Sequence, residues 1–413
     1  MRTAEIIAIG SELLTPTKID TNSLWFTEKL DEIGIGVMLK TIVGDDAVRL
    51  EAAIRDALTR SDIVITTGGL GPTEDDITRA VAAKAVSREL IYRDDIEQQL
   101  RERFKRWTSV MPEINKRQAY VIEGSDILPN PNGSAVGMLL ELGTKMLVIL
   151  PGPPRENQPM FVDHVYERLR SIAGETYVSR RLLRVSGMGE SAVDEIAAPI
   201  YTAYDNVQTS ILIGKSEIEL RIAARESDPR SAQAAADEVA EKITAAIGIA
   251  VFSTNGDSME QVIGKMLVDR GETLALAESC TGGLVSRRIT EIAGSSRYFI
   301  EGAVTYSNEA KVRTLGVDPK IIEDHGAVSA DCAEAMARGI RERSGAAHAI
   351  SITGIAGPDG GTEVKPVGTV YIGYSGPAGT RSRKFVFPGD RYLIRRHSSQ
   401  AALDYLRRQM LKL

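Results

Sequence analysis

Two strand-like runs each lead straight into a glycine-rich turn and then a helical stretch, and this pattern constrains the fold of the chain most. Residues Asp62–Thr67 run into Gly68-Gly69-Leu70-Gly71-Pro72, and Thr273–Ala277 run into Glu278-Ser279-Cys280-Thr281-Gly282-Gly283. A strand, a glycine turn and a helix in this order are typical of α/β domains, which bind ligands at the carboxyl ends of their strands. We therefore expect two ligand-binding α/β domains.

Apolar runs alternate with amphipathic stretches around both turns. In the first segment this rhythm predicts a parallel sheet covered by helices, with strands at Glu5–Ile9, Gly34–Val43 and Lys145–Leu150 and helices at Asn22–Ile33, Asp46–Ser61 and up to about Ser171. In the last segment it predicts helices at Ser258–Arg270, up to Ile292, Lys311–Leu315, Ala330–Ser344 and Arg391–Met410, with strands at Gly302–Ser307, His348–Ile355 and Gly368–Tyr374.

The middle of the chain has a different order of elements. It predicts strands at Tyr177–Val185, Val207–Ile213 and Ser216–Ala224, the last two joined by Gly214-Lys215, helices at Glu190–Ala203 and Pro229–Ile247, and a last short strand. The expected fold class is therefore α/β, with two three-layer α/β domains, residues 1–172 and 256–413, joined by a small α+β module, residues 173–255.

Composition narrows the class of protein. The net charge of −6 does not provide the positive surface that binding a nucleic-acid backbone requires. The two cysteines, Cys280 and Cys332, argue against a disulfide framework and fit a reducing compartment. The N-terminus lacks the length and flanks of a secretory signal, and no apolar run approaches a membrane span. We expect a cytoplasmic protein with neither nucleic acid nor membrane as a partner.

The histidines bear on which chemistry the last domain can perform. None of His164, His325, His348 and His397 stands in a metal-ligand spacing, and His348 lies in an apolar strand, where a packed neutral ring is the better interpretation. A zinc site and a Ser-His-Asp triad are therefore both poorly supported.

Ser279 follows a strand and precedes a helix, so its hydroxyl is expected at the carboxyl edge of the sheet beside free helix N–H groups. Gly282 and Gly283 leave the backbone bare, so that a substrate can approach those N–H groups as an oxyanion hole. The alternative is that Ser279 or Thr281 only caps the helix, and local sequence leaves the two interpretations about equal.

A serine nucleophile needs a base, and a buried lysine with a lowered pKa can serve as one. Lys311 follows the predicted strand Gly302–Ser307 and would lie near the same edge, where Tyr306 could hold it. By itself, Lys311 fits a solvated helix lysine better.

Longer motifs decide between these alternatives. The C-terminal segment resembles the CinA C-terminal domain family in Ala277–Gly283, Thr305–Lys311, His325–Ser329 and Ser351–Gly361. The resemblance implies a nicotinamide-nucleotide amidase that hydrolyses nicotinamide mononucleotide without a cofactor, with Ser279 as nucleophile, Lys311 as base and Tyr306 in support. It also implies that the loop Thr353–Gly361 lines the nucleotide site and that Arg391 binds the phosphate. The substrate contacts expected in this domain are Thr281, Gly282, Gly283, Thr353, Gly354, Gly357, Gly360 and Arg391.

The N-terminal segment carries a second set of motifs. The glycine turn offers N–H donors for phosphate, and Glu74, Asp75 and Asp76 offer oxygen ligands for a divalent metal, although acidic residues in a first helical turn need no ligand. Ser11–Leu14, Asp20–Asn22, Gly68–Arg79 and Leu150–Pro154 resemble the CinA N-terminal domain, which is related to molybdopterin-binding folds.

This second resemblance implies an ADP-ribose pyrophosphatase that uses Co, Mg or Mn. The metal or acid-base residues would be Glu12, Asp75 and Asp76, and the ligand contacts Asn22, Gly68, Gly69, Thr73 and Ser134. Two segments depart from the family pattern beside this pocket, Thr15-Pro16-Thr17 and Asn132–Gly137.

The middle module resembles the KH-like linker domain of the same family, but its Gly187-Met188-Gly189-Glu190 turn is not the loop that clamps nucleic acid. We interpret it as a spacer. The resemblance also implies a homodimer that binds nicotinamide mononucleotide and ADP-ribose. Two alternatives stay open, a deamidase with a vestigial nucleotide-binding front domain and a non-catalytic protein that binds nucleotides or pterins.

Overall fold

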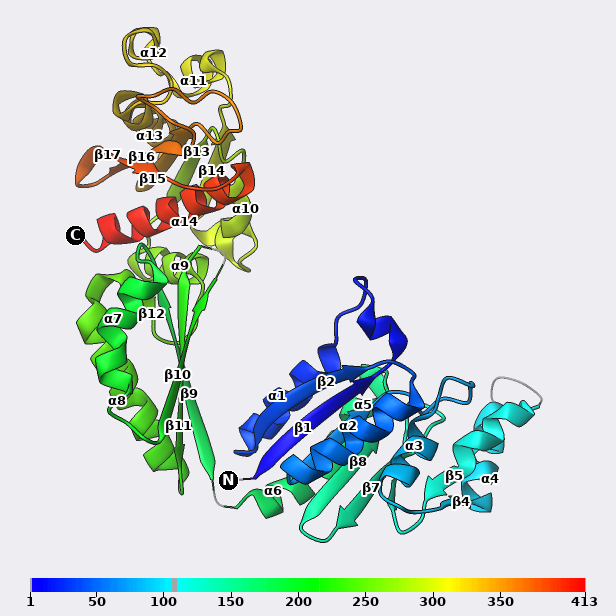
Figure 1. Ribbon diagram of the computed structural model, residues 1–413. Coiled ribbons are helices and arrows are strands. Elements are labelled where there is room, and N and C mark those ends of the chain that lie inside the picture. The colour runs from blue at the N-terminus through cyan, green and yellow to red at the C-terminus, as the bar shows by residue number, and fades with distance from the viewer. Residues whose placement is uncertain (1, 106–109, 175, 215, 413) are drawn as a thin grey trace. The chain divides into compact units, whose positions relative to one another are not determined.

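The computed structural model describes residues 2–105, 110–174, 176–214 and 216–412 (Figure 1). The chain divides into two compact units, one of residues 1–179 and 225–232 and the other of residues 180–224 and 233–413. In the described residues, no helix combines the length and the apolar character that crossing a membrane requires.

The first unit is built on a six-stranded sheet in the order β2-β1-β3-β8-β7-β6. Four strands are parallel to one another, namely β1 (Thr3–Ile9), β2 (Gly36–Val43), β3 (Ile63–Thr67) and β8 (Lys145–Leu150). The strand β7 (Gly137–Leu142) is antiparallel to β8, and β6 (Asp126–Leu128) is antiparallel to β7. The parallel pairing predicted for the first four strands is therefore confirmed, and the sheet is extended at one edge by two strands that were not predicted. The tight turn Gly143-Thr144 joins β7 directly to β8, and such a turn permits only antiparallel pairing.

Helices cover both faces of this sheet. The helices α2 (Ala47–Arg60) and α3 (Thr78–Ala85) pack on one face, and α1 (Thr21–Glu32), α5 (Pro154–Phe161) and α6 (Glu167–Ala173) pack on the other. A π-helical turn, Val162–Tyr166, interrupts the single helix predicted up to Ser171. The unit also contains α4 (Asp94–Lys105), 3-10 turns at Ser11–Leu14 and Glu113–Ala119, and a small sheet of β4 (Leu90–Tyr92) and β5 (Tyr120–Ile122).

The middle module has a four-stranded sheet in the order β10-β11-β9-β12. Its elements are β9 (Tyr177–Val185), α7 (Glu190–Tyr201), β10 (Val207–Ile213), β11 (Ile218–Glu226), α8 (Pro229–Ile247), a 3-10 turn (Gly248–Ala250) and β12 (Val251–Ser253). The predicted order of elements agrees with this one. Lys215, in the predicted link between β10 and β11, lies outside the described residues.

The C-terminal domain has a five-stranded sheet in the order β14-β13-β15-β16-β17. The strands β14 (Phe299–Val304), β13 (Leu274–Glu278) and β15 (His348–Gly354) are parallel to one another. The strand β16 (Thr369–Gly376) is antiparallel to β15, and β17 (Gly379–Val386) is antiparallel to β16. One face carries α9 (Met259–Arg270), α10 (Leu284–Thr290) and α14 (Arg391–Met410). The other carries α11 (Asn308–Leu315), α12 (Pro319–His325) and α13 (Ala330–Ser344), and a 3-10 turn lies at Ser295–Arg297. The α/β class with layered sheets and helices is confirmed.

One predicted boundary in this domain matters for the site. The strand predicted at Gly302–Ser307 ends at Val304, and the helix predicted from Lys311 begins at Asn308. The physical reason is the side chain of Ser307, whose Oγ accepts a hydrogen bond from the Ala310 N–H and so caps the helix one turn earlier. Lys311 therefore lies within the first turns of a formed helix.

Candidate functional site

Ser279 lies at the turn that follows the central strand β13. Its N–H donates to the carbonyl of Ile352 on β15 at 2.9 Å, and its own carbonyl accepts from the Gly282 N–H at 3.0 Å. The side chain is 8% exposed. The hydroxyl is thus fixed at the carboxyl edge of the sheet, as the strand-turn-helix pattern predicts.

Lys311 brings its side-chain nitrogen to the same point. Its Nζ lies 3.1 Å from Ser279 Oγ, 3.0 Å from the carbonyl oxygen of Thr305 and 3.3 Å from that of Tyr306. The side chain is 1% exposed, so the interpretation as a solvated surface lysine is wrong. The structure brings together the two residues that the sequence pairs as nucleophile and base.

The surroundings of Lys311 favour its neutral form. Burial lowers the pKa of the Lys311 amine, and the weaker opposing influences are Cys332, Cys280 and Glu309. Burial also raises the pKa of the Cys280 thiol to about 12, so this neighbour of Ser279 stays protonated. Ser279 and Lys311 are therefore a buried hydroxyl and a buried amine of lowered pKa in direct contact at this edge of the sheet.

The helix N–H groups beside Ser279 are not free, contrary to the prediction. The carboxylate of Glu278 accepts hydrogen bonds from the N–H groups of Val285 and Ser286, at 3.1 and 2.8 Å, and from the Ser286 hydroxyl at 2.7 Å. Glu278 is fully buried and directly precedes Ser279. The start of α10 is therefore capped by a carboxylate, and an oxyanion hole must use the turn before it. Sequence reasoning missed this role of Glu278, although a carboxylate before a helix is a capping signal.

Residues Cys280–Gly283 form that turn. Gly282 and Gly283 have φ of 58° and 87°, and a Cβ on either would meet no atom closer than 3.5 Å, so they keep the backbone bare. Thr281 is fully buried, and its carbonyl accepts from Arg395 Nη2 at 2.6 Å. No motif in the sequence marks Arg395, which lies one helical turn beyond Arg391 on α14.

Tyr306 supports Lys311 through its main chain only. Its phenol oxygen accepts a hydrogen bond from Arg391 Nη2 at 3.0 Å, and Arg391 Nη1 donates to the Gly357 carbonyl at 2.9 Å. The predicted contact between Tyr306 and Lys311 is therefore made by the Tyr306 carbonyl, at 3.3 Å from Lys311 Nζ, while the tyrosine ring points to the guanidinium of Arg391. Arg391 therefore links Tyr306 to the glycine-rich loop.

Packing accounts for part of the Thr353–Gly361 loop. Thr353 Oγ1 donates to the Ala327 carbonyl at 2.7 Å, and Cβ atoms on Gly354 and Gly357 would approach Val370 and Val367 to 2.7 Å. Only Gly360, with φ of 88°, has open surroundings. Substrate contact is therefore not needed to explain Thr353, Gly354 and Gly357.

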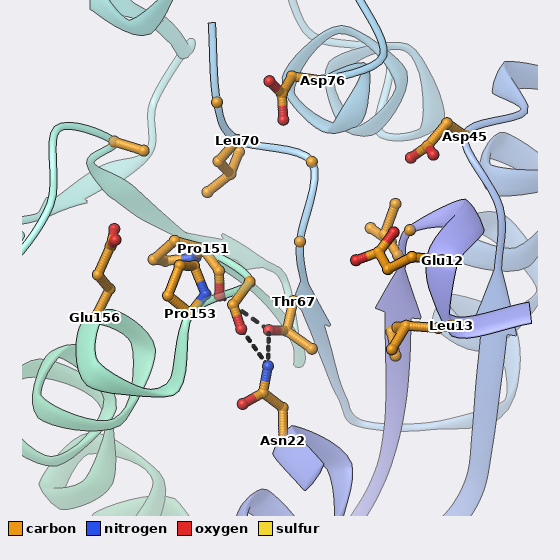
Figure 2. A pocket seen from close by; sticks show the side chains of 18 of the residues that line it. Glu12, Leu13, Asn22, Asp45, Thr67, Leu70, Asp76, Pro151, Pro153 and Glu156 are labelled. Carbon is orange, nitrogen blue, oxygen red and sulfur yellow. Dashed lines mark hydrogen bonds between the residues drawn. The ribbon is translucent and has the colours of Figure 1, made fainter. Parts of the chain in front are cut away.

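The first unit contains a pocket of about 620 Å³ at the carboxyl ends of β1, β3 and β8 (Figure 2). Among its lining residues are seven that the sequence singled out, namely Glu12, Asn22, Gly68, Gly69, Asp75, Asp76 and Ser134. Thr73 does not line it and instead donates its N–H to Asp76 Oδ2 at 2.8 Å. The carboxylate of Asp76 is therefore already held by its own turn.

Close packing also explains in part why Gly68 and Gly69 occupy the turn that lines this pocket. A Cβ on Gly68 would lie 2.1 Å from the Ile9 carbonyl oxygen, and one on Gly69 would lie 2.2 Å from Thr78 Oγ1. Buried Arg79, unnoticed in the sequence, holds the carbonyls of Leu70 and Gly71. Asn22 Nδ2 donates to Thr67 Oγ1 at 3.3 Å.

The predicted metal ligands share this pocket but do not form a metal centre. Within the described ranges, no group of three or more His, Cys, Asp or Glu side chains is placed to hold a metal ion. Figure 2 shows the carboxylates of Glu12, Asp45, Asp76 and Glu156 spread around the pocket. This donor set fits a divalent ion that arrives with phosphate oxygens, since Mg²⁺ commonly uses one or two carboxylates and the phosphates of a substrate.

Comparison with known proteins gives three matched family models. They are the CinA C-terminal domain at residues 256–410, a probable molybdopterin binding domain at 5–171 and the damage-inducible protein CinA KH domain at 180–253.

Individual relatives span the whole chain. A CinA-like protein of Koribacter versatilis is 47% identical over 412 residues, 99% of this chain and 100% of that protein. A putative competence-damage inducible protein of Caldicellulosiruptor saccharolyticus is 42% identical over 99% of both. The crystal structure of the competence/damage inducible protein CihA from Agrobacterium tumefaciens is 39% identical and covers 36% of this chain and 91% of its own, with a TM-score of 0.35. The chain therefore belongs to the CinA family.

Proposed function

We propose that the C-terminal domain deamidates nicotinamide mononucleotide by a serine–lysine mechanism. The observation that carries the proposal is the 3.1 Å distance between Lys311 Nζ and Ser279 Oγ, two side chains buried at the ligand-binding edge of an α/β sheet. Resemblance to nicotinamide-nucleotide amidases supplies the substrate.

The hydrogen bonds of Lys311 fit a general base. A neutral amine has two N–H donors and one lone pair, and the carbonyls of Thr305 and Tyr306 accept from the two donors. The lone pair is then left for the hydroxyl proton of Ser279. Burial lowers the pKa of Lys311 and so raises the fraction of the amine that is neutral.

The reaction follows in two steps. Lys311 takes the proton of Ser279, and Oγ attacks the carboxamide carbon to give a tetrahedral oxyanion. Lys311 then returns the proton to the departing nitrogen, ammonia leaves, and an ester to Ser279 remains. Water attacks this ester while Lys311 takes one of its protons, and transfer of that proton to Ser279 Oγ releases the acid.

The turn Cys280–Gly283 supplies the donors for the oxyanion. The N–H groups of Thr281 and Gly283 make no hydrogen bond to an acceptor in the described chain, whereas those of Val285 and Ser286 are taken by Glu278. Backbone N–H groups fixed in advance around the developing charge are an effective form of transition-state stabilisation. Arg391, held between Tyr306 and Gly357, is the group that we assign to the substrate phosphate.

The test compares Ser279→Ala and Lys311→Met with the wild-type protein, following ammonia and nicotinate mononucleotide together. Both variants should lose at least about a thousand-fold in kcat, the order of magnitude for removing a nucleophile or its base. The matched controls are Ser296→Ala and Lys320→Met, two exposed residues, and both should keep wild-type activity. Near-normal turnover in either site variant with an unchanged melting curve overturns the mechanism.

We also propose that the pocket of the first unit binds a phosphorylated nucleotide, with ADP-ribose as the substrate that the resemblance implies. Support comes from its volume of about 620 Å³, within the range of ligand sites, and from its position at the carboxyl ends of parallel strands. Glu12 and Asp75 are the residues that would hold a divalent ion with the ligand, and such an ion would neutralise phosphate charge.

This second function is tested by the release of AMP from ADP-ribose, with and without added Mg²⁺, Mn²⁺ or Co²⁺. Asp75→Asn should abolish metal-dependent release, and Glu74→Gln, which alters an exposed carboxylate paired with Arg117, should not. Equal loss in both variants, or no release under any condition, contradicts the proposal. Ammonia release from nicotinamide mononucleotide should be unaffected by the metal.

A further inference from the structure

Arg395 reaches from α14 to the turn Cys280–Gly283, beside Ser279. Its Nη2 donates a hydrogen bond to the Thr281 carbonyl at 2.6 Å and lies 3.5 Å from the position of a Cβ on Gly282. Backbone N–H groups stabilise an oxyanion only when they are held in place before the charge develops. The contact from Arg395 therefore falls on the segment whose conformation matters most to the proposed chemistry.

Two tight turns overlap at the peptide that joins Thr281 to Gly282. The Gly282 N–H donates to the Ser279 carbonyl at 3.0 Å and closes the first turn. The Thr281 carbonyl accepts from the Leu284 N–H at 3.3 Å and closes the second turn. Because a peptide group is planar and trans, its N–H and C=O point in opposite directions. A side chain that holds the Thr281 oxygen therefore orients this peptide and, with it, both turns.

The residues of this segment do not fix its conformation by themselves. Gly282 and Gly283 have φ of 58° and 87°, a region that glycine enters as readily as the ordinary one. The N–H groups of Thr281 and Gly283 flank the shared peptide, so their directions depend on how that peptide is held. A charge-assisted hydrogen bond is about twice as strong as a neutral one, so the guanidinium is a firmer constraint than the 3.3 Å contact from Leu284.

The positive charge of Arg395 also acts near Ser279. Its Nε is buried and has no hydrogen-bond partner in the parts of the chain that the structure describes. Burial raises the pKa of the Cys280 thiol, and Arg395 is among the groups that oppose this rise. Glu278 acts in the opposite sense, but its carboxylate is bound by the first N–H groups of α10. A cation beside the turn favours a negative oxygen that develops there.

From these contacts we propose that Arg395 is a positioning residue of the deamidase. It holds the turn Cys280–Gly283 in the conformation that presents the N–H groups of Thr281 and Gly283 to the oxyanion, and its charge favours that oxyanion. The proposal rests on the serine–lysine function proposed above. It predicts that loss of Arg395 slows the chemical step and leaves substrate binding almost unchanged.

This role differs from that of Arg391, one helical turn earlier on α14. Arg391 is held by Tyr306 and Gly357, on the side of the glycine-rich loop, whereas Arg395 is held by the turn that follows Ser279. We assign Arg391 to the phosphate, which is charged throughout the reaction. Arg395 acts on a charge that exists only while the carbonyl carbon is tetrahedral. The two arginines should therefore affect different kinetic constants.

The first experiment compares Arg395→Ala with the wild type on nicotinamide mononucleotide. A small misplacement of groups around the reacting atoms costs about a hundred-fold in rate, so kcat should fall by about that factor with KM little changed. Guanidinium chloride at a non-denaturing concentration should restore part of kcat, because the ion fits the space left by the truncated side chain. Sodium chloride at the same ionic strength should not. Arg395→Lys, which keeps the charge and a donor, should be more active than Arg395→Ala.

The second experiment measures Ser279 directly, without nicotinamide mononucleotide. A fluorophosphonate forms a bond between its phosphorus and Ser279 Oγ, fluoride leaves, and the hydroxyl proton passes to Lys311. The phosphoryl oxygen becomes more negative during this step and needs the same turn, so Arg395→Ala should be labelled more slowly than the wild type, and guanidinium should restore the rate.

The labelling separates failure of this role from failure of the proposed function. Equal labelling of the wild type and Ser279→Ala refutes the serine mechanism, and the role of Arg395 with it. Labelling of Ser279 without hydrolysis of nicotinamide mononucleotide refutes only the substrate, and the labelling rates still decide the role of Arg395.

The control variant is Arg381→Ala, an exposed arginine of β17, which should match the wild type in both experiments. Melting curves show whether each variant is folded. Labelling of Arg395→Ala at the wild-type rate, or a raised KM with unchanged kcat, overturns the positioning role. Equal losses in Arg395→Ala and Arg395→Lys that guanidinium does not restore also overturn it, because the side chain then only stabilises the fold.

Discussion

Lys311 Nζ lies 3.1 Å from Ser279 Oγ, with the remaining contacts of the amine directed to the carbonyls of Thr305 and Tyr306. The lysine comes from α11, and the serine from the turn after β13. The register of β13 with β14 aligns Glu278 with Val304, so the residues that follow each strand emerge side by side. The sheet therefore brings the serine and the lysine together.

The pH dependence of deamidation should report the ionisation of Lys311. Only the neutral amine accepts the Ser279 proton, so kcat/KM should rise with pH along one ionisation whose midpoint lies below the ordinary lysine value of 10.5. Initial rates across the neutral and alkaline range measure this profile. Lys311→Arg, which keeps the charge but cannot deprotonate, should be inactive at every pH. A rate that falls through the same range would contradict the assignment.

Stability should change with pH for the same reason. The folded pKa of Lys311 is lowered, so between that pKa and 10.5 the unfolded chain binds more protons than the folded chain, and the free energy of unfolding rises with pH. Lys311→Met removes this dependence. The melting temperature of the wild type should therefore rise relative to that of Lys311→Met as pH increases from the folded pKa of Lys311 to 10.5. Ser279→Ala is the control, and its melting temperature should change with pH as that of the wild type does. Parallel curves of melting temperature against pH for the wild type and Lys311→Met would exclude the lowered pKa.

Glu278 should be important to both stability and turnover. Glu278→Ala leaves the N–H groups of Val285 and Ser286 without their acceptor, and loss of a helix cap costs about 0.5–2 kcal/mol. The variant should melt earlier and lose kcat, because the turn that holds Ser279 is no longer fixed. Ser286→Ala removes one of the three hydrogen bonds and should have a smaller effect. If Glu278→Ala has the wild-type melting curve, the cap does not contribute to stability.

Arg391 should act on substrate binding rather than on the chemical step. A charge-assisted hydrogen bond contributes about 1.5–3 kcal/mol, so Arg391→Gln should raise KM for nicotinamide mononucleotide roughly 10- to 100-fold with kcat little changed. Tyr306→Phe removes the phenol that holds Arg391 and should raise KM less. Nicotinamide riboside, which lacks the phosphate, provides the control, since its kcat/KM should be the same for the wild type and Arg391→Gln. Equal losses for both substrates would assign Arg391 a structural role.

Much of the fold follows from local sequence. The turns of residues 68–72 and 278–283, the helices and most strands are predictable because hydrophobic period, caps and glycine positions act over a few residues. The antiparallel edges were not predicted, because pairing direction depends on which strands become neighbours. The predicted strand reached Ser307 for a different reason, because the cap that its side chain gives to α11 is a local signal that the apolar strand pattern obscured.

The sequence by itself determined the α/β class, the family resemblance and the identity of Ser279 and Lys311, because these depend on residue types in a fixed local order. Only the tertiary structure decided that Lys311 is buried against Ser279, that Glu278 takes the helix N–H groups, and that Tyr306 contacts Arg391. Burial and hydrogen-bond partners depend on chain segments far apart in sequence. Local pattern therefore names the candidate residues, whereas packing sets their pKa values and contacts.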